Sequence, residues 1–216
     1  SGRRWRPVVF LAAVATVTGR ADPAPAQVPA TATVSGDRSV AWSIESAVLA
    51  APEGLREGAE VRAWTRDDRL EVLRPGTNDI VCLADRPDDE RFHAACYHVG
   101  LEPFMERGRE LARRGVPAAA RNGIRWEEIE RGLLPMPAAA AVYNLDFADA
   151  DFDPALTDPA SGARLHAIYM PGATGESTGL PVRPVDGPWL MLAGTPSAHV
   201  MIALPARAPP ESGGGR

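Results

Sequence analysis

The spacing of apolar residues changes twice along this chain, and the order of these changes limits the folds that it can adopt. Short alternating runs, typical of half-buried strands, come first, at residues 59–64, 70–74 and 80–84. Helical spacing follows between Pro103 and Leu134, and alternation then returns. Strands, then helices, then strands predict an α+β domain with a mainly antiparallel sheet and two or three helices on one face.

Two helices are expected in the middle of the chain and a short one near its start. The most clearly marked helix lies between Pro103, which suits a first turn, and Gly115, which suits the end. A second is expected over residues 125–134, with three inward-facing residues: Trp126, Ile129 and Leu133. Ser43 is the expected cap of the early helix, and Pro52 ends it.

The first three strands are expected to form an antiparallel meander, because polar turns at residues 66–68 and 75–78 separate them. Later alternating runs complete the sheet, at residues 141–147, 165–170, 189–193 and 198–204. In the last run, alternation places Val200 and Ile202 on the core side. His199 should then point outward or into a cleft.

The first 26 residues have the composition of a secretory signal peptide. Basic residues at positions 3, 4 and 6 precede a short apolar run, and Ala24-Pro25-Ala26 has the small residues that a signal peptidase requires. The run is about half of the ~20 residues that a membrane-spanning helix needs. We therefore expect cleavage after Ala26, a periplasmic or extracellular protein, and no stable membrane insertion after cleavage.

The remaining chain is expected to hold one domain. Residues 27–39 are rich in Pro, Ala, Thr and Ser and predict a flexible leader, and residues 206–216 predict a disordered tail. Residues 40–205 then form a single globular domain of ordinary size.

The charge balance excludes nucleic acid as a partner. The whole chain has a formal net charge of −5, and without residues 1–26 it would have 19 Arg against 27 Asp and Glu, or −8. All 23 basic residues are arginine, which a GC-rich genome explains, and they form no basic stripe. Phosphate neutralisation supplies most of the affinity for nucleic acid, so an acidic domain is a poor binder.

Cys82 and Cys96 are the only cysteines, and an even number in an exported chain favours a disulfide, here closing a 15-residue loop. His93 and His98 lie nearby and give the alternative of a four-ligand zinc site. The paired CxxC spacing of specific zinc motifs is absent, however. We therefore expect the disulfide, with both histidines in surface loops.

Several short segments carry a resemblance to other proteins. They are Ile44-Glu45-Ser46-Ala47, Leu73-Arg74-Pro75-Gly76-Thr77-Asn78 and Gly187-Pro188 with His199-Val200-Met201-Ile202, together with the two cysteines. In these segments the chain, from about Ile44 to Pro205, resembles a group of exported bacterial proteins with no assigned activity. The resemblance implies export and names no reaction.

Ser177 lies in a Gly-x-Ser-x-Gly segment, and Asp186 and His199 follow it in the order that α/β-hydrolases use for their triad. A nucleophile elbow needs a strand directly before the serine and a helix after it. Pro171-Gly172 breaks the preceding strand and Leu180-Pro181 opposes the helix, so a glycine-rich surface loop is expected instead. Among all residues of the chain, His199 is the strongest single candidate for a polar residue of a functional site.

Asp149, Asp151 and Asp153 alternate as do the first ligands of an EF-hand loop. Pro154 replaces the turn glycine and Ala160 replaces the bidentate glutamate, so we expect a solvated acidic loop and no metal. No cofactor is expected.

Two functional hypotheses remain, and whether the protein is an enzyme stays open. The preferred one is an exported non-catalytic domain that binds a small molecule, an envelope component or a protein, because no complete catalytic set is present. The alternative is an exported hydrolase that uses Ser177 or a site centred on His199.

Overall fold

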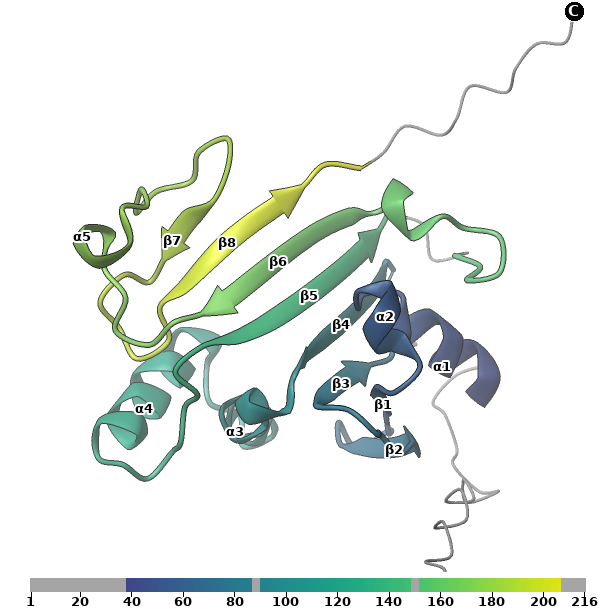
Figure 1. Ribbon diagram of the computed structural model, residues 1–216. Helices are drawn as coiled ribbons and strands as arrows, with labels where there is room; N and C mark the ends of the chain where they lie inside the picture. The colour runs from purple at the N-terminus through teal and green to yellow at the C-terminus, as the bar shows by residue number, and fades with distance from the viewer. Residues whose placement is uncertain (1–37, 87–89, 149–151, 207–216) are drawn as a thin grey trace, which may run out of the picture.

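The computed structural model describes residues 38–86, 90–148 and 152–206 and shows an α+β fold around one eight-stranded, mostly antiparallel sheet (Figure 1). The strands are β1 (Glu60–Trp64), β2 (Leu70–Arg74), β3 (Ile80–Leu83), β4 (Phe92–His98), β5 (Ala140–Phe147), β6 (Ala163–Tyr169), β7 (Trp189–Met191) and β8 (His199–Leu204). Their order in the sheet is β2-β1-β3-β4-β5-β6-β8-β7. The predicted fold class is confirmed. The proposed signal peptide, most of the leader and residues 207–216 lie outside the described residues.

Five α-helices lie in the described part of the chain, against the two or three expected. They are α1 (Val40–Val48), α2 (Glu53–Arg56), α3 (Glu102–Arg113), α4 (Ala118–Glu130) and α5 (Gly175–Thr178), with two 3₁₀ turns at Val99–Leu101 and Pro159–Ser161. The central helix α3 is confirmed, with Pro103 in its first turn and Gly115 at φ 75° after its end. The additional helices α2 and α5 are single turns of four residues each.

The other two expected helices begin earlier than predicted. Helix α1 is capped by Ser39, whose Oγ accepts a hydrogen bond from the Trp42 amide, and Ser43 is instead buried within the helix. Helix α4 begins after Pro117, which the apolar spacing alone did not show. It ends before Gly132, at φ 70°, so Leu133 lies beyond the helix and is 64% exposed.

The first three strands do not form a meander. β1 and β2 are an antiparallel hairpin, but β3 lies on the other side of β1 and runs parallel to it. The loop after β2 crosses back over the chain before β1, where the amides of Thr77 and Asn78 both donate to the Gly58 carbonyl. A Cβ on Gly76 would come within 2.9 Å of the Glu60 amide, so the crossing requires glycine there.

Helices cover both faces of the sheet, so the prediction of one covered face is wrong. Neighbouring residues of β4 show this, because Cys96 packs in the cluster with Ala47 of α1 and Tyr97 packs in the cluster with Met105 of α3. Successive side chains of a strand point to opposite faces. We call these the α1 face and the α3 face.

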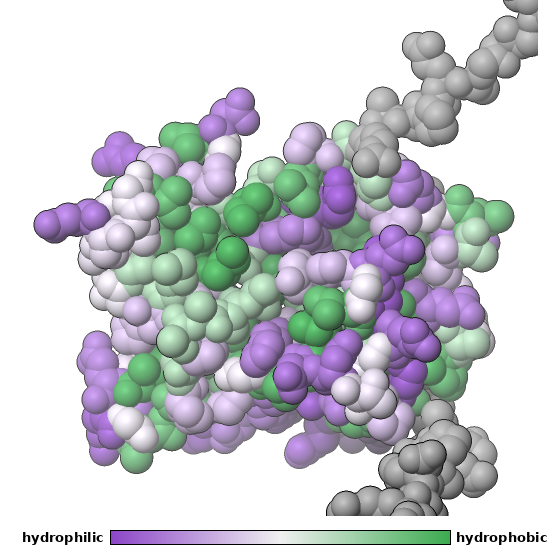
Figure 2. Space-filling view, viewed as in Figure 1, coloured by the Kyte–Doolittle hydropathy of each residue, from purple (hydrophilic) through white to green (hydrophobic). Residues whose placement is uncertain are grey.

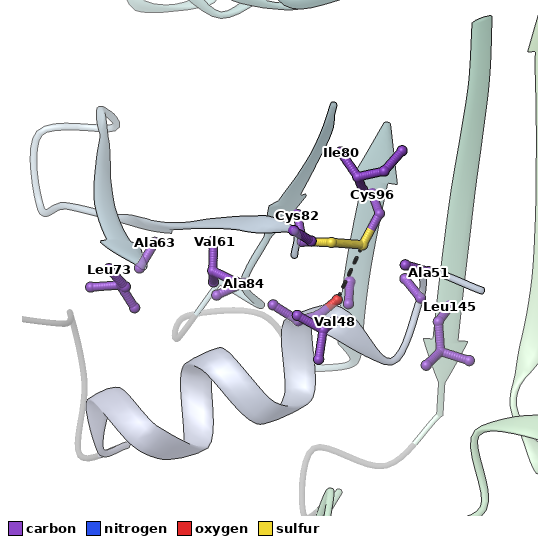
Figure 3. Packing of buried hydrophobic residues seen from close by; sticks show 14 of the residues in the cluster. Val48, Ala51, Val61, Ala63, Leu73, Ile80, Cys82, Ala84, Cys96 and Leu145 are labelled. Atoms are coloured by element: carbon purple, nitrogen blue, oxygen red, sulfur yellow. Dashed lines mark hydrogen bonds between the residues drawn. A yellow bond between two sulfur atoms is a disulfide. The ribbon is translucent and has the colours of Figure 1, made fainter. Parts of the chain in front are cut away.

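The α1 face holds the larger hydrophobic core, in which Figure 3 shows α1 packed against residues of several strands, among them Val61 of β1 and Cys96 of β4. Phe92 of β4 is fully buried there and stacks on Phe152, with ring centroids 4.0 Å apart. The Trp42 ring packs edge-on against the Phe92 ring, with the two ring centroids 6.1 Å apart. Beyond α2 the same face is free of helices over β6 and β8, where Figure 2 shows apolar side chains at the surface.

Candidate functional site

The two cysteines form a disulfide that joins β3 to β4. Cys82 and Cys96 lie directly opposite each other in the ladder, with Cα atoms 4.0 Å and sulfurs 2.11 Å apart. Both residues are fully buried under α1, where the Cys96 sulfur is 3.4 Å from the Ala47 carbonyl oxygen (Figure 3). The disulfide prediction is confirmed, and the zinc alternative is excluded because both sulfurs are used.

His93 and His98 lie on β4, a strand that the sequence analysis missed, and not in surface loops. His93 Nδ1 is 2.8 Å from a carboxylate oxygen of Asp146 on β5. His98 Nδ1 accepts a hydrogen bond from the Gly100 amide and caps the following 3₁₀ turn. Both imidazoles therefore have local structural partners.

The three triad candidates do not hydrogen-bond to one another. Ser177 lies in α5, where its hydroxyl is hydrogen-bonded to the backbone of Thr174 in a capping box. Asp186 lies exposed in the loop before β7. His199 begins β8, and its Nδ1 is 2.8 Å from the Ser197 carbonyl oxygen, which leaves no carboxylate at that nitrogen.

His199 is buried, contrary to the expectation that it points outward or into an open cleft. It is 8% exposed and stacks on Tyr169, with ring centroids 4.8 Å apart. Helix α4 reaches this end of the sheet, and its Trp126 donates a hydrogen bond to the Ser197 hydroxyl. Burial lowers the pKa of His199, so the ring is neutral at pH 7.

The acidic loop supplies local hydrogen bonds where it is described. Asp153 accepts from the Ala155 amide and Asp158 from the Ala160 amide, each through its own carboxylate. Asp149 and Asp151 lie outside the described residues. Within residues 38–86, 90–148 and 152–206, no group of three His, Cys, Asp or Glu side chains is placed to hold a metal ion.

The most distinctive hollow lies on the α3 face, between α3, α4 and the end of the sheet, and has a volume of about 450 Å³. A cavity of this size is in the range of small-molecule sites. Its walls are Trp64, Asp68, Leu83, Arg86, Met105, Gly108, Arg109, Ala112, Arg113, Arg121 and Arg125. Five of these residues are arginines and only one is acidic. We call this hollow the arginine pocket.

Three of the five arginines are balanced by carboxylates. Arg86 pairs with Asp68, and Arg109 and Arg113 both pair with Glu106, all at 2.6–2.7 Å. Burial alone would lower the pKa of Arg109, but its acidic neighbours outweigh burial and raise the pKa above its ordinary value. These side chains are held in place by their partners.

Arg121 and Arg125, one turn apart on α4, have no carboxylate partner among the described residues. The Arg121 Nε donates to the Val116 carbonyl at 2.8 Å, and one Arg125 nitrogen donates to the Phe104 carbonyl at 3.2 Å. Burial lowers the pKa of Arg125, and the nearby charge of Arg121 lowers it further. Arginine nevertheless stays charged at neutral pH, so uncompensated positive charge lines this side of the pocket.

Close packing fixes the Arg125 guanidinium. It lies over the Phe104 ring, 3.9 Å from the centroid, and its Nε is buried without a hydrogen-bond partner. A Cβ on Gly108 would come within 2.8 Å of another of its nitrogens, so the glycine allows this close approach to α3. A buried donor without a partner is costly, so this packing holds the guanidinium in place at the expense of one hydrogen bond.

The arginine pocket also has apolar lining residues, and a smaller hollow lies beside it. These apolar residues are Trp64, Leu83 and Met105, and Leu83 and Met105 belong to one hydrophobic cluster. The second hollow, of about 190 Å³, shares Trp64, Leu83 and Arg86 with the arginine pocket and adds Ala84, His93 and Ala95. The two hollows are therefore neighbours on the α3 face.

A further cavity on the α1 face is similar in size but electrically balanced. It has about 460 Å³ and lies between β6 and the segment that joins α1 to α2. Its two arginines, Arg56 and Arg164, face two carboxylates in the same wall, Glu53 and Asp158. His166 completes the wall, and burial lowers its pKa, with a smaller contribution from Arg164. Of these three hollows in the described part of the chain, the arginine pocket has the clearest excess of one charge.

The arginine pocket was not predicted, because the many arginines of the chain were explained by a GC-rich genome and not by a binding site. A local signal existed, since Arg109 and Arg113 on α3 and Arg121 and Arg125 on α4 are each four residues apart and so share a helix face. These arginine-bearing sides of the two helices meet only because α3 packs against α4 (Figure 1).

Comparisons of the chain with protein-family models, with curated proteins and with solved structures found no match. In the described part of the chain, no helix has the length and apolarity needed to cross a membrane.

Proposed function

We propose that this protein is an exported, non-catalytic binding domain whose ligand is a small organic anion held in the arginine pocket. The observation that carries the proposal is the pair Arg121 and Arg125, two cations without a carboxylate partner in the described residues, at the wall of a 450 Å³ cavity. Guanidinium groups bind carboxylates, sulfonates and phosphates through charge-assisted hydrogen bonds.

The surroundings support an organic anion over a simple inorganic one. Trp64, Leu83 and Met105 line the same pocket as the arginines, and apolar lining residues favour a ligand with an apolar body. The net charge of the chain is −5, so the positive site contrasts with an acidic molecule. The buried disulfide supports export, because disulfides persist in oxidising compartments.

Titration with anilinonaphthalene sulfonate, a fluorescent aromatic anion, tests this function. Arg125→Gln and Arg121→Gln should each raise the dissociation constant about tenfold or more, because each removes charged hydrogen bonds from a partly buried site. Added salt should weaken binding to the wild type through screening of the same charges.

Arg114→Gln is the matched control for these variants. Arg114 follows α3, is largely exposed and lies outside the pocket wall, so the change in net charge is identical and only its position differs. Its dissociation constant should stay within about twofold of the wild type. Equal losses in Arg114→Gln and Arg125→Gln would show that the anion does not bind in this pocket.

A further inference from the structure

The two hollows on the α3 face lie next to each other, since Trp64, Leu83 and Arg86 line both, and we call the two together the track. Leu83 of β3 lies opposite Ala95 of β4, and His93 is the next residue of β4 on the same face. Leu83 lines both hollows, whereas Met105 lines only the larger one and Ala95 only the smaller. A ligand that reaches from α4 to Ala95 would therefore cross the apolar surface of Leu83.

The lining residues of this track change from charged at one end to mainly apolar further along. At the α4 end, Arg121 and Arg125 supply positive charge without carboxylate partners in the described residues. Met105 and Leu83 line the middle part, and Ala84 and Ala95 line the far hollow together with His93, whose ring is bound to Asp146. Arg86 lies along the way, but Asp68 pairs with its charge and the Trp64 ring packs against its guanidinium at 3.7 Å.

We propose that the ligand is a linear alkyl carboxylate, with its carboxylate at Arg121 and Arg125 and its chain running over Leu83 into the hollow at Ala95. This inference rests on the proposed function and extends it from an organic anion to an elongated one. The small side chain of Ala95 sets the depth of the second hollow. The chain length that fits is therefore limited by that 190 Å³ space.

A series of carboxylates from acetate to decanoate tests the inference by competition against anilinonaphthalene sulfonate. Affinity should rise by up to about fourfold for each methylene that becomes buried, and should stop rising when the second hollow is full. Arg125→Gln should weaken every member of the series by a similar factor, because the charged group is common to all.

Ala95→Leu should remove most of the gain from chain length, because the larger side chain fills the second hollow. Ala163→Leu is the control, since Ala163 is exposed on β6 and lines neither hollow, and its chain-length dependence should equal that of the wild type. Ala95→Val makes the same test with a smaller side chain that suits a strand, in case leucine prevents folding.

The outcomes separate this inference from the proposed function. Binding that depends on Arg125 but is the same for acetate and octanoate overturns the elongated ligand and leaves the anion site standing. A length dependence that Ala95→Leu and Ala95→Val leave intact also overturns it, because the chain would then lie elsewhere. Absence of any Arg125-dependent anion binding overturns both.

Discussion

The α1 face and the α3 face are built from alternate residues of the same strands, yet they differ in what they enclose. On the α1 face, Phe92 and the disulfide are fully buried in a core that α1 closes. On the α3 face, Leu83 is only partly buried and lines a cavity whose other wall is α4. The α1 face is therefore a closely packed core, whereas the α3 face contains a cavity lined by charged side chains.

The difference indicates how stability and binding are divided in this fold. On the α1 face the disulfide joins β3 to β4 beneath α1, and Phe92 of β4 stacks on Phe152, so the α3 face can keep a hollow over the same two strands. Cavities and desolvated charges reduce stability, and a compact opposite face offsets that cost. Substitutions on the two faces should therefore have different consequences.

The largest contrast is expected between two phenylalanines, one from each face. Phe92→Ala should reduce the free energy of unfolding by about 3–5 kcal/mol, because it empties the centre of the aromatic cluster, and should leave anion affinity within about twofold. Phe104→Ala should reduce stability and also weaken anion binding, because its ring supports the Arg125 guanidinium. Denaturant unfolding and sulfonate titration measure the two quantities. Equal losses of affinity in both variants would contradict the division between the faces.

Removal of the disulfide should have the next largest effect on stability. Closing a loop of about 15 residues stabilises the folded state by about 3 kcal/mol in the chain-entropy model, so Cys82→Ala with Cys96→Ala should lose about that amount. Reductant should lower the melting temperature of the wild type and leave that of the double variant unchanged. Sensitivity of both to reductant would mean that the effect does not come from this bond. Anion affinity at 25 °C should be preserved, because the sulfurs lie on the α1 face.

Local signals in the sequence were enough to predict α3, β2 and the disulfide. Helical spacing with Pro103 and Gly115 marks α3, and two lone cysteines in a chain expected to be exported can pair only with each other. The strand β4 was missed because its buried residues include Ala94 and Cys96, which are too small to make a clear alternation. Such errors come from weak local patterns.

Other features depend on contacts between distant segments. The parallel pairing of β1 with β3 follows from the crossing loop at Gly76, which resembles an ordinary hairpin turn in the sequence. The arginine pocket depends on α3 and α4 packing side by side, and periodicity within either helix does not show that contact. His199 was predicted to be accessible because nothing local indicated that α4 would reach Ser197.

The smallest expected effect compares one histidine from each face. Burial lowers the pKa of His199 on the α3 face, and burial together with Arg164 lowers the pKa of His166 on the α1 face. Because the unfolded chain binds these protons more readily than the folded protein does, the free energy of unfolding should fall as pH decreases from 7.5 through the ordinary histidine range near 6.5.

His199→Asn should make this pH dependence shallower while keeping an amide donor for the Ser197 carbonyl. His166 should still contribute to the pH dependence of the free energy of unfolding in this variant. Adding His166→Asn to His199→Asn should remove that remaining contribution. Denaturant unfolding at several pH values between 7.5 and 5 measures the slope in each variant. A slope that His199→Asn leaves unchanged would show that the pKa of His199 is the same in the folded and the unfolded chain.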